Sequence, residues 1–277
     1  MKVDKQKIGS SFREVVSFDS IHEFNKYICE TPLNDSFRWV DLSSSKQSAE
    51  RLRFTGTKSF EEAQNLLKNG WDDMSNKITQ RLRVDDVEIK PCMAYKNVLG
   101  IQGFQPIVPL YLQGVPQNMA SRRMVPIKQK IINLNKSISY SSFWKTEDIM
   151  EESIKAFKLI KRLESQNYRC GLNIVFGADT MRNSYIVIIK VKSPNEKLNI
   201  SKLTFPLINP SMLRRLIFRF IEVHPGVPKS FVGGYGSPLS DSELSEIVPG
   251  YLLPKEIKFD VDKIRSIDDL QKSLKKR

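Results

Sequence analysis

Two spacings of hydrophobic residues along the second half of the chain predict its helices and strands. Apolar side chains at helical spacing, with lysines opposite them, predict a helix that begins near Thr146: Ile149, Met150, Ile154, Phe157, Ile160 and Leu163. Glu147 and Asp148 in its first turn suit the helix dipole. Residues 128–134 predict a strand that leads into a polar loop, and two apolar runs predict buried strands at residues 171–176 and 185–191.

The alternation of predicted helices and strands continues to the end of the chain. Asn209 and Pro210 open a further helix, with one apolar face made by Leu213, Leu216, Ile217 and Phe220. A final strand is predicted near 256–261 and a helix from about 266. Strand, helix, strand, strand, helix, strand, helix is typical of the α/β class, with an open sheet and flanking helices.

The first part of the chain has a different pattern. Ser59 is predicted to cap a helix, because Glu62 follows three residues later, and Gly70 is predicted to end it. Residues 91–126 are rich in proline and glycine and predict irregular structure with short strands. We therefore expect an irregular α+β region at residues 1–126 and an α/β domain at residues 127–277.

Charge is the strongest feature of the composition. The 277 residues include 44 Lys and Arg against 31 Asp and Glu, a formal net charge of +13. An acidic protein, DNA or RNA would neutralise this charge, and an ordinary lysine-rich surface is the alternative. The candidate contact residues are taken from the basic clusters: Arg122, Arg123, Lys128, Lys130, Arg214 and Arg215.

Several classes of protein are disfavoured by what the sequence lacks. No apolar run approaches the 18 residues of a membrane span, and the first residues contain no apolar leader segment. Three scattered cysteines do not predict a disulfide framework, so we expect a reducing compartment and no membrane. No phosphate-binding loop is present, and no spacing of acidic residues predicts a catalytic metal site.

One short run resembles a known ligand site. Asn135, Ser137 and Ser139 alternate in a predicted loop, 135–146, at the end of the first strand. Their spacing resembles the Asp-x-Ser-x-Ser metal-ion-dependent adhesion site of von Willebrand factor A domains. The resemblance implies that fold, a divalent cation held by these residues, and a further contribution from Asp179. Asn replaces the anionic first ligand and Lys136 adds positive charge, so we expect no cofactor, with Mg²⁺ as the alternative.

Four segments in order resemble uncharacterised proteins of bacteriophages and related mobile elements. They are Phe54-x-Gly56-Thr57-x-Ser59-x-Glu61-Glu62-Ala63 with Leu66 and Gly70-Trp71, then Val108-Pro109-x-Tyr111-Leu112-x-Gly114-x-Pro116-x-x-Met119, the Asn-x-Ser-x-Ser run, and Pro210-x-x-Leu213-Arg214-Arg215. The resemblance implies a phage origin.

The charge, the altered ion site and the phage-like segments together favour a non-enzymatic interaction or assembly protein. We expect it in the virion or the host cytoplasm, bound to other phage proteins and forming an oligomer. One alternative is an intracellular nucleic-acid-binding factor in replication, transcription or defence evasion. Another is a metal-assisted enzyme whose acidic ligands converge only in the fold.

Overall fold

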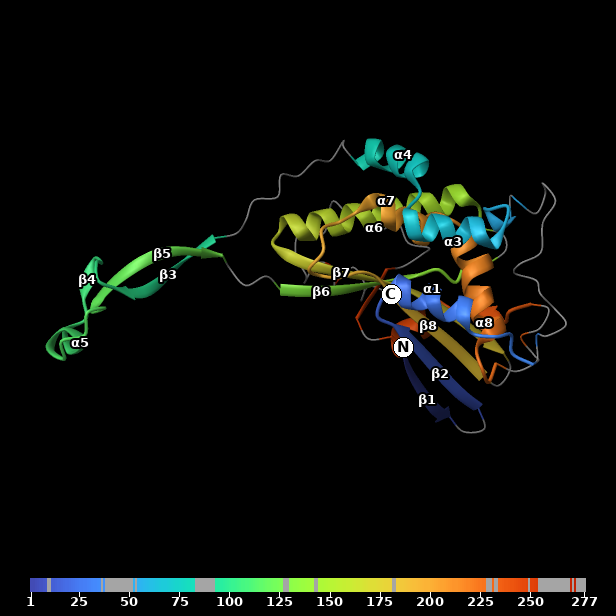
Figure 1. The fold of residues 1–277 in the computed structure, drawn as a ribbon, viewed down its shortest axis with the longest axis horizontal. Helices are drawn as coiled ribbons and strands as arrows, with labels where there is room; N and C mark the ends of the chain where they lie inside the picture. The colour runs from blue at the N-terminus through green and yellow to red at the C-terminus, as the bar shows by residue number, and fades with distance from the viewer. Residues whose placement is uncertain are drawn as a thin grey trace.

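The structure is a computed structural model with two parts, a body and a protruding arm (Figure 1). It describes residues 1–8, 11–35, 37, 52, 54–82, 93–126, 130–141, 144–180, 183–227, 231, 234–248, 250–253, 270 and 272. We call residues 93–126 the arm and the other described residues the body.

The body is built on one mixed sheet with the strand order β1-β2-β8-β7-β6-β10, and β9 pairs with β7. β7 and β8 form an antiparallel hairpin, whereas β2 runs parallel to β8 and β6 runs parallel to both β7 and β10. The α/β class is therefore confirmed, with a mixed sheet. The strands are β1 (Lys2–Ile8), β2 (Ser11–Phe18), β6 (Lys130–Ser137), β7 (Tyr168–Thr180), β8 (Asn183–Lys192), β9 (Ser237–Pro238) and β10 (Tyr251–Leu253).

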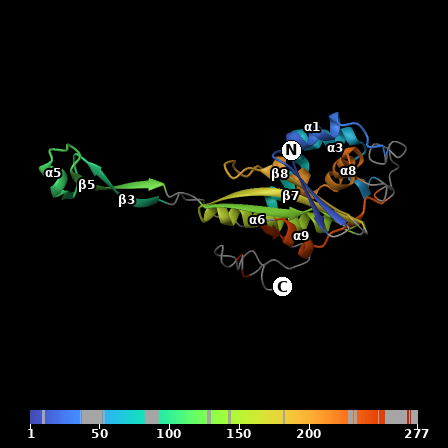
Figure 2. The same cartoon turned by 90° about the horizontal axis from the view of Figure 1, so that it is seen from below.

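Helices cover both faces of this sheet. The larger core lies on one face, under α1 (Ile21–Glu30), α3 (Phe60–Asn69), α4 (Asp72–Leu82), α6 (Thr146–Ser165), α7 (Ile200–Ile208), the π-helix η2 (Met212–Ile217) and α8 (Phe218–Val223). On the other face lies α9 (Asp241–Ile247) (Figure 2). Leu244 of α9 belongs with Val175 and Ile186 to a smaller core. Among the described helices, none is long and apolar enough to cross a membrane.

The predicted boundary at residue 126 does not separate two cores. β1 and β2 belong to the same sheet as β6 to β10, and helices α1, α3 and α4 contribute side chains to the larger core. The reason is the parallel pairing of β2 with β8, from Phe12 opposite Asn183 to Phe18 opposite Ile189. The first segment of the chain thus completes the sheet of the second.

The helix caps follow the sequence closely. Ser59 caps α3 by accepting a hydrogen bond from the amide of Glu62, and Gly70 ends the helix with φ +94°, as predicted. Glu62 in turn accepts a hydrogen bond from the amide of Lys58, one residue before the cap. The helix predicted with Thr146 as its cap is α6, but Lys145 holds the cap position and Thr146 is the first helical residue.

Other predictions need correction. β6 continues to Ser137, so Asn135 and Ser137 lie in a strand and not in a loop, because β6 pairs with β7 along this whole stretch. The helix predicted from Asn209 is preceded by α7, which the sequence reading missed because it contains Pro206. The strand predicted near 256–261, the helix predicted from about 266 and Lys128 lie outside the described residues.

The arm is a small sheet of its own that projects from the body in both views (Figures 1 and 2). It consists of β3 (Met93–Gly100), β4 (Gln105–Pro106), the short helix α5 (Val108–Leu112) and β5 (Met119–Pro126). β5 is central, with β3 and β4 antiparallel to it on either side. The proline- and glycine-rich segment therefore holds two eight-residue strands, longer than the short pieces predicted.

Candidate interaction surface

Hydrogen bonds fix the backbone at the tip of the arm. The amide of Phe104 donates to the carbonyl of Ala120 at 2.8 Å, and the amide of Ile107 donates to the carbonyl of Asn118 at 2.7 Å. Gly103 is required there, because a Cβ at this position would lie 2.1 Å from the Ala120 oxygen. The tip is thus an ordered structure that presents its side chains outward.

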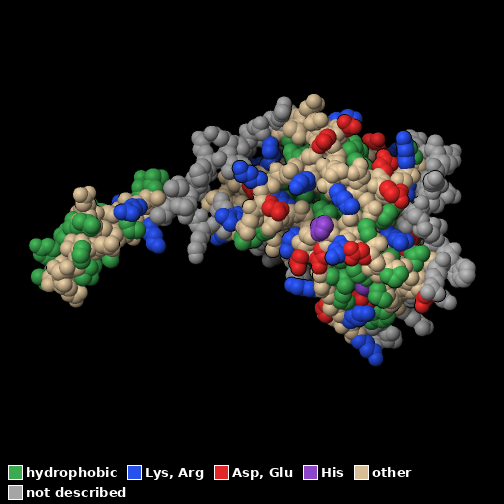
Figure 3. Space-filling view, in the orientation of Figure 1, with side chains coloured by type: hydrophobic (Ala, Val, Ile, Leu, Met, Phe, Trp, Pro, Cys, Tyr) green, Lys and Arg blue, Asp and Glu red, His purple; other side chains and the backbone are tan. Residues whose placement is uncertain are grey.

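Those side chains are apolar and exposed (Figure 3). Tyr111 and Leu112 are 65% and 77% exposed. Of the twelve large hydrophobic residues that the described chain exposes, eight lie in the arm: Tyr95, Leu99, Ile101, Phe104, Val108, Tyr111, Leu112 and Met124. Monomeric soluble proteins rarely display contiguous apolar surface of this kind, and where it occurs it marks interaction sites.

Charge is distributed unevenly along the arm. Residues 97–121 contain no charged side chain, in a chain that is 27% charged. Lys96, Arg122 and Arg123 are the only charged residues of the arm. Lys96 lies directly across from Arg123, and the Arg122 guanidinium lies 5.4 Å from the centre of the Phe104 ring. The sequence reading missed this tip, although the long uncharged run was a signal that could have found it.

The predicted basic contact residues divide into two groups. Arg122 and Arg123 are exposed on β5, and Lys130 is exposed at the start of β6. Arg214 and Arg215 are buried, with Arg215 0% exposed. The prediction that these two arginines contact an acidic partner is therefore wrong, because both are buried.

Arg214 and Arg215 instead anchor the loop before α3. Arg215 donates to the carbonyl of Thr57 at 2.8 Å, and Arg214 donates to the carbonyl of Phe54 while its guanidinium lies 3.9 Å from the Phe54 ring centre. The side chains of Thr57 and Ser211 share a hydrogen bond of 2.7 Å. Residues 54–57 and 211–215 thus meet at η2, and Arg214 also donates to the carbonyl of Ser141.

The three residues of the predicted metal site make protein contacts. Asn135 accepts a hydrogen bond from the Asn173 side chain at 2.9 Å, and Ser139 accepts one from the amide of Gly177 at 2.8 Å. The Ser137 hydroxyl oxygen accepts a hydrogen bond from the amide of Ser139 at 3.4 Å. Asp179 accepts a hydrogen bond from Ser184. In the described part of the chain, no three His, Cys, Asp or Glu side chains are grouped so that they could hold a metal.

Lys136, which lies between two of those residues, points to the opposite face of the sheet. Its ammonium lies 3.2 Å from a carboxylate oxygen of Glu152 on α6 and donates to the hydroxyl of Tyr140. Lys136 is 0% exposed, so the pair is inside the larger core. Burial and then the charge of Glu152 hold the pKa of Tyr140 well above its usual value, so this hydroxyl keeps its proton.

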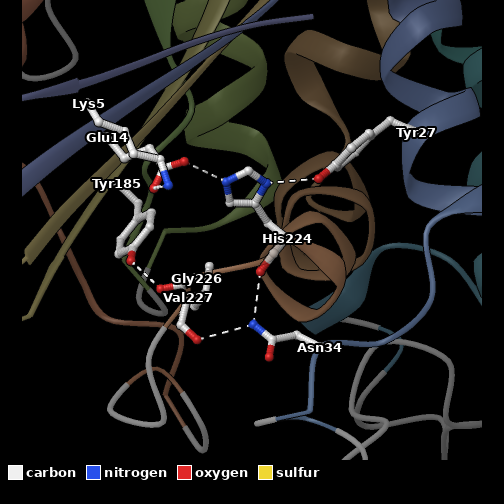
Figure 4. Close-up of polar contacts among 8 residues, drawn as sticks. All are labelled: Lys5, Glu14, Tyr27, Asn34, Tyr185, His224, Gly226 and Val227. Atoms are coloured by element: carbon white, nitrogen blue, oxygen red, sulfur yellow. Dashed lines mark hydrogen bonds and ion pairs between the residues drawn. The ribbon is translucent and has the colours of Figure 1, made fainter.

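A second buried polar network joins the N-terminal strands to α8 (Figure 4). The His224 ring lies 2.8 Å from Glu14 through Nε2 and 2.9 Å from the hydroxyl of Tyr27 through Nδ1. Lys5 lies 3.2 Å from the other oxygen of Glu14. Asn34 donates to the carbonyl of His224 at 2.9 Å. His224 is 3% exposed, so the arrangement acts as an internal brace between β2 and α8.

The Glu14 carboxyl makes this brace sensitive to acid. Burial alone raises its pKa, but the hydrogen bond and charge of His224, with those of Lys5, outweigh burial and leave the pKa below the ordinary 4.5. A carboxyl with a lowered folded pKa contributes stability above its unfolded pKa and loses it as the pH falls through the folded value. We expect urea unfolding to show a steeper loss of stability below pH 4.5 in the wild type than in Glu14→Gln. Glu30→Gln, at an exposed carboxyl, is the control, and an equal slope in all three proteins would contradict this role.

Comparison with known proteins gives one result that covers nearly the whole chain. No curated protein and no solved structure matches it. The model of one family, described as "Domain of unknown function (DUF7192)", matches residues 7–276 and so spans both the arm and the body. The chain belongs to the DUF7192 family.

Proposed function

We propose that this protein is a non-enzymatic interaction and assembly protein, in which the rigid α/β body carries the apolar arm into contact with another protein. The observation that carries the proposal is the exposed tip, with Ile101, Phe104, Tyr111 and Leu112 on an ordered backbone. Burying one such side chain contributes about 1.5–3 kcal/mol, so a few of them are enough for a specific contact. Nucleic acid is a poorer fit, because residues 97–121 have no cation of their own to offer phosphate groups and only Arg122 reaches Phe104.

Crosslinking from the tip tests this proposal. A photo-crosslinking phenylalanine analogue in place of Tyr111 is expected to form protein adducts in cells of the source organism. The same analogue in place of Ile131, which is 59% exposed on the body, is the control and is expected to form few. Adding Leu112→Asp should reduce the Tyr111 adducts by about 10-fold or more, because a charge replaces a buried apolar group. Equal adducts from both positions, unaffected by Leu112→Asp, would refute the proposal.

The phage origin and a place in the virion belong to the same proposal. What supports them is the resemblance carried by the four segments, of which one forms the tip of the arm and two others meet at η2. Mass spectrometry of purified virions tests the virion assignment. Recovery of peptides from residues 93–126 supports it, and absence of the chain from the particles removes it.

The finer fold assignment is also proposed. A von Willebrand factor A-like arrangement is supported by Asn135 and Ser137 at the carboxyl end of β6, by Ser139 just after it, and by α6 that follows. Such an edge is where open α/β sheets bind ligands. The metal-assisted enzyme remains an alternative. It would be favoured if Mg²⁺ or Ca²⁺ raised the melting temperature of the wild type but not that of the double variant Ser137→Ala/Ser139→Ala.

Nucleic-acid binding is the second candidate, favoured by one feature of the arm. Its three charged residues are all basic, and Lys96 lies across from Arg123. If these cations contact phosphates, affinity for double-stranded DNA will fall steeply with salt, and Arg122→Gln/Arg123→Gln will lower the slope of log K against log salt by about 2. No binding to DNA or RNA at low salt removes this candidate.

A further inference from the structure

Among the residues that the structure describes, no strand pairs with the outer edge of β3. In the arm, β3 pairs with β5 on one side only. Sheet edges of soluble proteins are usually protected by charged side chains against pairing with another chain. β1, an edge strand of the body, follows this rule with Lys2, Asp4, Lys5 and Lys7. β3 has eight residues and a single charge, at Lys96.

The side chains of β3 also leave one face of the arm apolar. Successive residues of a strand point to opposite faces, and residues directly opposite in an antiparallel pair share a face. Tyr95 therefore lies beside Met124, and Leu99 beside Ala120, on the same face of the arm. Tyr95 is 72% exposed and Leu99 49%. A three-stranded sheet this small, without a core, gains stability when a partner covers such a face.

We propose that β3 pairs antiparallel with β3 of a second copy of this chain, about a two-fold axis at Asn97. This inference rests on the proposed function and names the partner of the arm. A two-fold axis perpendicular to the sheet places residues of the same face opposite each other. An axis at Asn97 sets Tyr95 opposite Leu99 of the second copy and Leu99 opposite its Tyr95, so the apolar face continues across the junction.

In this register Lys96 and Arg123 of both copies stay off the apolar face, because they lie on the opposite face of the arm from Tyr95 and Leu99. Lys96 is opposite Val98 of the second copy, and the two Lys96 side chains are diagonal neighbours, about 7–8 Å apart at Cα. An axis at Lys96 would instead place the two ammonium groups directly opposite each other. The uncharged run at residues 97–121 brings no repulsion of its own, even though each chain carries a net charge of +13. The two arms can therefore associate while the two basic bodies stay apart at opposite ends.

Disulfide crosslinking at the axis tests the register. In full-length protein with Cys29→Ser and Cys92→Ser, Asn97→Cys is expected to form disulfide-linked dimers under mild oxidation. Directly opposite residues of an antiparallel pair lie about 4.5–5.5 Å apart at Cα, within the range of a disulfide. Val98→Cys is the matched control, because two diagonal residues are too far apart to link. Equal linkage at both positions would overturn the register.

Sedimentation of the full chain tests the association itself. The wild type is expected to form dimers, and Asn97→Lys should weaken dimerisation by about 30-fold or more, because it places two like charges on the axis. Gln102→Lys adds the same charge to the arm outside β3 and should leave the dimer intact. A wild type that stays monomeric, or a dimer insensitive to Asn97→Lys, overturns the inference. If the chain is monomeric but Tyr111 still crosslinks to a different protein, this inference fails and the proposed function stands; if neither occurs, both fail.

Discussion

Replacing Lys136 with methionine is expected to lower the free energy of unfolding by about 3–5 kcal/mol. Lys136 is 0% exposed, and its ammonium lies 3.2 Å from Glu152. Removing one member of a buried ion pair leaves the other charge in the core without its counter-charge, and this costs more than the pair contributes when intact. Urea unfolding measures the change, with Lys197→Met, at an exposed position of the body, as the control.

The double variant Lys136→Met/Glu152→Met separates the ion pair from packing. Two apolar side chains of similar size remove both charges together, so most of the lost stability should return. A double variant that is less stable than Lys136→Met alone would contradict the explanation. Such a result would mean that Glu152 stabilises the core through contacts that do not depend on Lys136.

Replacing Arg215 with alanine is expected to destabilise the protein by about 3–5 kcal/mol, as expected when a large core side chain is truncated. Arg215 is among the largest fully buried side chains of the described chain, and it donates to the carbonyl of Thr57. Its loss leaves a cavity. It also frees the loop before α3, in which Gly56 lies close to Asn209 with φ +83°. Hydrogen exchange should therefore increase first at residues 54–57.

Two further substitutions make this prediction specific. Arg215→Lys should recover little, because an ammonium does not reproduce the planar set of donors of a guanidinium. Arg123→Ala removes the same charge from the exposed face of β5 and should change stability by less than about 0.5 kcal/mol. If Arg123→Ala costs as much as Arg215→Ala, net charge and not the buried contact explains the effect.

Local signals in the sequence predicted local structure well. Ser59, Glu62 and Gly70 mark the ends of α3, because each supplies or frees a hydrogen-bonding group at a helix terminus. The apolar runs at residues 171–176 and 185–191 lie within β7 and β8. They are recognisable in the sequence because a fully buried strand needs apolar side chains on both faces.

The pairing of strands that are far apart along the chain could not be predicted from the sequence. Nothing in residues 2–8 or 11–18 indicates that they join a sheet through β8, a strand that begins at Asn183, because the partner of a strand is set by the whole fold. In the sequence, Arg214 and Arg215 resemble a surface cluster. What marks them as buried is their contact with backbone carbonyl groups, which only the folded structure shows. The sequence predicts an irregular arm because most of its prolines and glycines lie between β3 and β5, whereas the two strands pair regularly.

The contact made by the arm can be measured directly by hydroxyl-radical footprinting. Oxidation of Phe104, Tyr111 and Leu112 is compared between the dilute purified chain and the assembly isolated from its source, with exposed Ile131 of the body as the internal reference. If the tip is the contact surface, its three side chains will oxidise several-fold more slowly in the assembly while Ile131 is unchanged. Equal oxidation of the tip in both samples would contradict an arm that binds protein.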